Sequence, residues 1–219
     1  MVRMSRMPPS SARSTPSGSS GSSANRPYHH GDLRTALLRS AERTLREKGA
    51  GALSLRELAR DIGVSHAAPG RHFKDKQTLL DALALHGYER LNQALTVAAD
   101  RPVQSFEERM TALARAYLGF AVDNPELLEL MFTRKHHPDS SAQLTDAVDQ
   151  SLGSLTRMMA DAQERGEIVQ GDPERITTVV AASLHGLAAL IASCALDAEE
   201  ALAGLDEHVH LLLHGLKPR

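Results

Sequence analysis

Cysteine and aromatic side chains are scarce in this 219-residue chain, and their scarcity excludes several classes of protein. The single cysteine, Cys194, cannot form an intrachain disulfide, and a zinc site built from several cysteines is excluded as well. Tryptophan is absent and aromatic residues make up 3% of the chain. Alanine and leucine must therefore fill the core, which favours packed helices over sheets. We expect an all-α fold and a reduced, cytoplasmic setting.

Long apolar runs are also rare. The N-terminus lacks the apolar stretch of about 7–15 residues that a secretory signal needs, so secretion is not expected. Residues 176–196 carry no charge and are about long enough to cross a bilayer, but they include polar side chains such as Thr177 and His185. Many of the others are alanines, so burial in a subunit interface explains this helix better than a membrane span. No membrane partner is expected.

Signatures of catalysis and cofactor binding are missing. The sequence holds no P-loop, no GxGxxG fingerprint, no GxSxG elbow and no HExxH motif. Three histidine groups invite a metal interpretation: His29-His30, His136-His137, and His208 with His210 and His214. A metal site needs three or four converging ligands, and no cysteine or HExxH partner accompanies them, so we interpret them as structural or solvated. A helical metalloenzyme stays a minor alternative; we predict no catalytic residue, no metal, no cofactor and no enzyme activity.

The net charge of −2 conceals an asymmetry between the two parts of the chain. Residues 1–76 carry 14 Lys and Arg against 6 Asp and Glu, whereas residues 77–219 carry 11 against 21. A basic first third joined to an acidic remainder indicates that the first part meets a polyanion. A chance distribution over one soluble surface is the alternative.

Composition divides the chain into three parts. Residues 1–27 are rich in Ser, Pro, Gly and Arg and hold almost no apolar side chains apart from methionines, so we expect a disordered basic arm. Its arginines suit a phosphate or a minor groove, although a solvated tail is the simpler interpretation. Residues 28–76 are predicted to form a helical DNA-binding domain, and residues 77–219 a larger helical domain.

Capping signals and a 3.6-residue period predict about nine helices. The first runs from Asp32 to Lys48, before Gly49, and a third, short helix is expected to begin at Ser65. The other predicted starts are the capping boxes Ser54–Glu57 and Ser105–Glu108, Asp75, Asn124-Pro125, Asp172-Pro173, and Asp197 for the last helix. No useful stretch alternates with period two, so no sheet is predicted.

The segment from Ser54 to Lys76 carries the clearest functional signal. A short helix, a Gly63-Val64 turn and a second short helix make a helix-turn-helix, whose second helix lies in the major groove. Its early residues face base edges, and the basic residues that follow supply donors for phosphates or guanine. The predicted DNA-binding residues are Ser54, Ser65, His66, Ala67, Ala68, Gly70, Arg71, His72, Lys74 and Lys76.

The chain resembles the TetR family of transcriptional regulators. The resemblance rests on LSLRELARDIGVS at 53–65, RHFKDKQTLLDAL at 71–83 and PYHHGDLR at 27–34. The last of these, with Leu184-His185-Gly186, resembles the branch with a WHG-type C-terminal domain. Many relatives have Leu-Tyr where this chain has Pro69-Gly70, which removes one expected phosphate contact and one early helical hydrogen bond.

The resemblance implies a three-helix DNA-binding domain, a ligand-binding domain and dimerisation through the last two helices. Methionines beside aromatics between about 105 and 166 suit a malleable apolar cavity, although ordinary core filling explains any one of them equally well. The predicted ligand-binding residues are Met110, Tyr117, Phe120, Met131, Phe132, Met158 and Met159.

Small side chains form a stripe on the uncharged helix, at a spacing that lets two helices approach closely. With an apolar face on the last helix, this stripe predicts a four-helix dimer interface. The predicted interface residues are Ala182, Gly186, Ala189, Ser193, Leu202, Leu205, Val209 and Leu212. These observations together predict a homodimeric repressor that leaves a palindromic double-stranded operator when a small apolar or amphipathic effector binds. The alternative is a small-molecule sensor or carrier with vestigial DNA binding.

Overall fold

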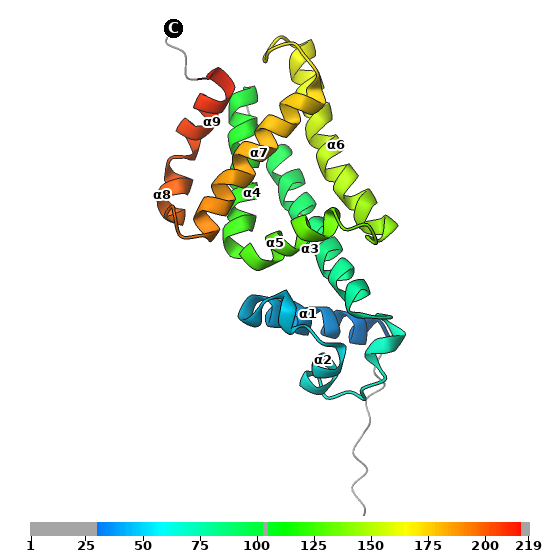
Figure 1. The fold of residues 1–219 in the computed structure, drawn as a ribbon. Helices are drawn as coiled ribbons and strands as arrows, with labels where there is room; N and C mark the ends of the chain where they lie inside the picture. The colour runs from blue at the N-terminus through cyan, green and yellow to red at the C-terminus, as the bar shows by residue number, and fades with distance from the viewer. Residues whose placement is uncertain (1–29, 103–104, 216–219) are drawn as a thin grey trace, which may run out of the picture.

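The computed structural model describes residues 30–102 and 105–215, and over these ranges it contains nine α-helices, two short 3-10 helices and no strand (Figure 1). The helices are α1 (His30–Lys48), α2 (Leu55–Asp61), α3 (Lys76–Ala99), α4 (Phe106–Asp123), α5 (Pro125–Lys135), α6 (Ala142–Glu164), α7 (Pro173–Ala192), α8 (Ala198–Ala203) and α9 (Leu205–His214); the 3-10 helices are η1 (Ala50–Ala52) and η2 (Pro69–Arg71). The all-α prediction is confirmed. The predicted basic arm lies outside the described residues.

Residues 30–76, which we call the head, form one end of the molecule (Figure 1). Leu37, Leu58 and Phe73 are almost completely buried and hold α1, α2 and the segment after η2 together. The long helix α3 starts in the head and continues into the remainder of the protein, which we call the body. In the body α3 packs against α4, α5 and α6, while α4 also packs against α7 and α9.

The closest approach of α3 to α5 depends on a glycine. A Cβ placed on Gly87 would lie 2.5 Å from the Met131 Sδ and 3.3 Å from the Leu127 Cγ. Real Cβ atoms essentially never have contacts under 3 Å, so a side chain at residue 87 would force the Met131 side chain to move. Gly87 thus lets the Met131 side chain of α5 pack directly against the backbone of α3.

Most predicted helix starts are correct. Asp75 Oδ1 accepts the Thr78 N–H at 2.8 Å and Ser105 Oγ accepts the Glu108 N–H at 3.1 Å. Asp172 and Asp197 cap α7 and α8 in the same way. Ser54 stands at the N-cap of α2 without a side-chain cap hydrogen bond, so the predicted capping box there is wrong in its bonding although right in its position.

The predicted third helix is replaced by a turn and the 3-10 helix η2. Pro69 has no N–H to donate to the Ser65 carbonyl four residues earlier, so the α-helical ladder cannot begin there. The Ala68 N–H instead bonds to the Ser65 carbonyl at 3.0 Å, and the Arg71 N–H to the Ala68 carbonyl at 3.3 Å. Both bonds have the tighter i to i+3 spacing of a 3-10 turn.

The single last helix predicted from Asp197 is divided into α8 and α9 at Gly204. Glycine has a low helix propensity, so a helix interrupted there is physically reasonable. Beyond the interruption, Leu205 and Val209 are fully buried on α9, which packs against α4. Their expected place in a subunit interface is therefore corrected: they belong to the core of the individual chain.

Candidate DNA-binding head and effector region

Most of the predicted DNA contacts are exposed on the surface of the head. Pro69 and Phe73 are buried and anchor the segment that carries them. The predicted contacts Ser65, His66, Ala67, Gly70, Arg71 and Lys74 are exposed, whereas Ser54, Ala68, His72 and Lys76 are half-buried. An apolar anchor under an exposed, basic and hydroxyl-bearing surface is the arrangement that a DNA-reading segment needs.

Lys76 has a structural contact that the sequence did not predict. Its Nζ donates to the Gly51 carbonyl at 2.9 Å and ties the start of α3 to η1. An ammonium group has three donors, so two stay available for a phosphate.

Two arginines near this surface were missed as candidate contacts. The Arg34 guanidinium lies 5.5 Å from the centre of the Phe73 ring, which places a cation from α1 beside the segment. Arg56 is exposed in the first turn of α2, the helix that crosses the DNA backbone in such motifs. The basic charge of residues 1–76 indicated cations in the head. Only the packing shows which cations accompany the proposed DNA-reading segment.

The seven predicted effector residues separate into two groups. Met110, Phe120, Met131 and Met159 are buried in the main hydrophobic core, and Tyr117, Phe132 and Met158 are half-buried against it. Met159 also lines an apolar groove of about 310 Å³ with Ile168, Ile176, Val179 and Leu213. The other six do not line this groove. The expectation of an apolar cavity bounded by all seven stays a prediction.

Tyr117 and Phe132 meet a third side chain that the sequence marked only as part of a family motif. The Tyr117 hydroxyl lies 3.0 Å from His185 Nδ1, and the Phe132 ring is stacked on the imidazole with ring centres 3.8 Å apart. The Lys135 ammonium lies 4.4 Å from the centre of the Phe132 ring on α5. Four side chains from α4, α5 and α7 thus form one half-buried polar cluster, which we call the Tyr117–His185 cluster.

The electrostatics of this cluster favour neutral groups. Burial, together with the nearby Lys135, lowers the pKa of His185, and burial also lowers the pKa of Lys135. Burial raises the pKa of Tyr117. At pH 7 the imidazole is therefore neutral and the phenol protonated, so the hydroxyl can donate to Nδ1. Such a site presents apolar rings with a few directed polar atoms.

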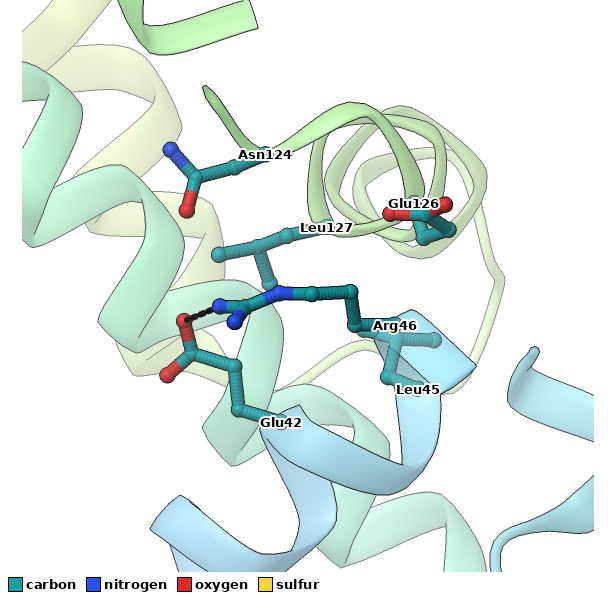
Figure 2. Close-up of a pocket in the computed structure, with 6 residues that line it drawn as sticks. All are labelled: Glu42, Leu45, Arg46, Asn124, Glu126 and Leu127. Carbon is teal, nitrogen blue, oxygen red and sulfur yellow. Dashed lines mark ion pairs between the residues drawn. The ribbon is translucent and has the colours of Figure 1, made fainter. Parts of the chain in front are cut away.

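One ion pair joins the head to the body and was not predicted. Arg90 of α3 lies 2.6 Å from Glu42 of α1 and donates to Asn124 Oδ1 at 2.8 Å. Figure 2 shows Glu42 and Asn124 bordering a small cleft, where Arg46 also pairs with Glu42 at 3.7 Å. Because Asn124 Oδ1 accepts from Arg90 and its Nδ2 donates to the Phe120 carbonyl, the side chain does not cap α5 as expected.

A buried ion pair connects α5 to the first part of α3. Arg134 Nε donates to Asp81 Oδ1 at 2.7 Å, and Nη1 donates to Gln77 at 2.7 Å. The second Asp81 oxygen accepts the Ser141 N–H at 2.9 Å, at the start of α6. The Arg134 and Asp81 side chains are 4% and 9% exposed. This buried pair therefore links α3, α5 and the start of α6.

The face of α7 offers apolar surface to a partner. Only 22% of its most apolar 18-residue window is buried, although this is the one helix in the described residues long and apolar enough to span a membrane. Ala182, Gly186, Ala189 and Ser193 are all exposed, while Leu202 and Leu212 are half-buried. Val179 and Leu190 add exposed apolar area on the same helix, at 60% and 50%.

The protein is all-α, its head is of the helix-turn-helix type, and its body holds an apolar groove. This architecture is typical of DNA-binding regulators. The chain matches two models of one family: the N-terminal model "Bacterial regulatory proteins, tetR family" over residues 37–83 and the "Tetracyclin repressor-like, C-terminal domain" over residues 110–216. The chain belongs to the TetR family of transcriptional regulators.

The individual relatives agree with this assignment. A solved protein of unknown function from Rhodococcus sp. RHA1 is 44% identical with a TM-score of 0.77, over 87% of this chain and 100% of its own. The transcriptional regulator Mb1846 of Mycobacterium bovis is 32% identical over 46% of this chain; the match spans 43% of that regulator's length. FadR of Bacillus subtilis, solved with stearoyl-CoA, shares the fold with a TM-score of 0.70 at 14% identity over 84% of this chain and 99% of its own.

Proposed function

We propose that this transcriptional regulator is a cytoplasmic homodimeric repressor that binds a palindromic operator and is released by a small apolar or amphipathic effector. The observation that carries the proposal is the head: buried Pro69 and Phe73 hold Ser65–Ala67, Arg71 and Lys74 on one exposed surface. TetR-family regulators bind DNA and effectors and are dimers.

The second candidate function is an effector sensor or carrier with little DNA specificity. It is favoured by the 3-10 turn at Pro69–Arg71, which presents fewer ordered side chains to a groove than a full recognition helix does. The regulator is the better supported of the two, because the basic surface and its anchor are retained around the turn.

The Tyr117–His185 cluster is the proposed place of effector contact. A ligand that inserts between Phe132 and His185 would replace a stacking contact and gain a hydroxyl and an imidazole as hydrogen-bond partners. A same-fold regulator that holds an acyl-CoA supports a long apolar effector with a polar end. Binding would favour a second arrangement of α5, and the fraction of protein in the DNA-binding arrangement would fall.

The proposal is tested by binding-site selection from random duplexes, followed by affinity measurements over a range of salt concentrations. Replacing Arg71 and Lys74 together with Ala should weaken binding and flatten its salt dependence by about two phosphate contacts per chain, or about four per dimer, since fewer counterions are released. The control is Arg101→Ala with Arg157→Ala, which removes the same charge from exposed positions of the body.

The outcomes separate the two candidate functions. A selected sequence that is distinguished from random duplex at physiological salt supports the repressor. Weak binding without sequence preference, which disappears steeply with salt, supports the sensor instead. If the head variant and the control variant lose the same affinity, the head is not the DNA-reading surface.

A further inference from the structure

Two histidines at one end of α9 meet a carboxylate from the first turn of α4. Glu107 Oε1 lies 3.0 Å from His210 Nδ1, and its Oε2 lies 3.1 Å from His214 Nε2. One ligand atom from each residue lies within 4.8 Å of the others. In Figure 1, α9 runs alongside α4, so the end of one helix reaches the start of the other.

The sequence shows half of this arrangement. His210 and His214 are four residues apart, a spacing that places two side chains on the same face of a helix. Their rings lie 4.4 Å apart, centre to centre. Glu107 is 103 residues from His210, and only the packing of α9 on α4 brings it there. The sequence offers these histidines no cysteine or HExxH partner, but the fold brings the Glu107 carboxylate to them as a third candidate ligand.

The separations within the cluster are compatible with one small cation. Imidazole nitrogens and carboxylate oxygens bind zinc at about 2.0–2.2 Å, so neighbouring ligand atoms of a tetrahedral site lie about 3.3 Å apart. The separations from Glu107 Oε1 to His210 Nδ1 and from Glu107 Oε2 to His214 Nε2 are within a few tenths of an ångström of that value. All three side chains are partly exposed, between 35% and 55%, which leaves an entry path and room for water in the remaining positions.

We propose that Glu107, His210 and His214 bind one divalent first-row transition metal ion. Two imidazoles with one carboxylate suit zinc, copper, nickel or iron(II), whereas calcium and magnesium prefer oxygen ligands alone. The bound ion joins α9 to α4 across more than 100 residues of chain. It thereby stabilises the C-terminal helix, which carries the half-buried Leu212 of the proposed dimer interface.

The test uses the full chain, stripped with a chelator, dialysed and titrated calorimetrically with zinc chloride at pH 7.5. Wild type should bind one zinc ion per chain. His210→Ala, His214→Ala and Glu107→Gln should each weaken that binding at least about tenfold, the smallest loss expected when a metal site is damaged. The matched control is His208→Gln, on the same helix, because His208 Nε2 faces Ser183 at 3.0 Å rather than the cluster.

Thermal unfolding gives a second measurement. Zinc at a hundredfold excess over its Kd should raise the wild-type Tm by about 5–10 °C and leave the three cluster variants within about 1 °C of their zinc-free values. One-to-one binding that survives in all three cluster variants would place the ion elsewhere, at His29-His30 or His136-His137 for example. That result, or a wild-type chain that neither binds zinc stoichiometrically nor gains stability from it, overturns the proposal.

Discussion

Substituting Gly186 should separate the stability of the chain from the stability of the proposed dimer. A Cβ placed on Gly186 meets no heavy atom within 4 Å, so any side chain there projects into open space on a single chain. Removing a glycine from the interior of a helix stabilises that helix by up to about 1 kcal/mol. For a chain of this size that gain corresponds to a rise in Tm of about 2–4 °C. The single chain should therefore tolerate Gly186→Leu.

The dimer should not tolerate it. In an interface around a two-fold axis the substitution occurs twice, and each overpacked site costs about 1–3 kcal/mol. A total of about 2–6 kcal/mol weakens dimerisation roughly thirtyfold to twenty-thousandfold. Sedimentation over a wide concentration range measures this constant, and affinity for the selected palindrome should fall with it. Gly186→Ala, with a much smaller side chain, should lose far less.

The matched control is Gly153→Leu on α6. Its Cβ would meet only the flexible end of Arg157, at 3.6 Å, so it gives a similar gain in helix propensity away from the α7 face. This variant should dimerise and bind DNA as wild type does. A Gly186→Leu chain that sediments as a normal dimer and binds the palindrome normally would refute the interface assignment.

Two further predictions concern buried polar groups in the body. Arg134→Leu leaves the buried Asp81 carboxylate without its charged partner and should reduce the free energy of unfolding by about 3–5 kcal/mol in urea titrations. Adding Asp81→Leu to this variant should restore part of that loss. Equal losses in the single and the double variant would contradict the pairing. Burial lowers the pKa of His185 in the folded chain. As the pH falls through the ordinary histidine pKa, the unfolded chain therefore binds a proton at this residue before the folded chain does, and the free energy of unfolding decreases. In thermal unfolding, His185→Gln should lose less stability between pH 7.5 and pH 5.5 than wild type does. If the pH dependence of stability is unchanged in this variant, His185 is not the source of that dependence.

The features that sequence predicted well are local in the chain. A capping hydroxyl or carboxylate bonds to an N–H two or three residues later, so Ser105 and Asp172 were recognisable without any knowledge of the fold. Pro69 was recognisable as the loss of one helical bond, but the replacement of the whole expected helix by a 3-10 turn also depends on how Phe73 is anchored in the core. The local pattern marked residues 54–76 as the proposed DNA-reading segment and predicted the wrong conformation for part of it.

Contacts between distant residues were beyond the sequence patterns. Leu205, Val209 and Leu212 share an apolar helix face, and periodicity cannot distinguish the part buried against α4 from the part left to a partner. Ion pairs such as Glu42–Arg90 join residues 48 positions apart, and their existence depends on the relative rotation of two packed helices. Charge patterning along one chain gives the number of such groups but not their pairing.

The position of α5 gives the proposed effector response a route from the body to the head. One part of α5 carries Phe132, which is stacked on His185, while Arg134 is held by Asp81 on α3. The same α3 begins in the head, so a movement of α5 that separates Phe132 from His185 must either carry α3 with it or break a buried ion pair. Breaking the pair is costly, because a charge would stay buried without a partner. In the proposed mechanism α3 would therefore move with α5 and change the orientation of the proposed DNA-reading segment relative to the body.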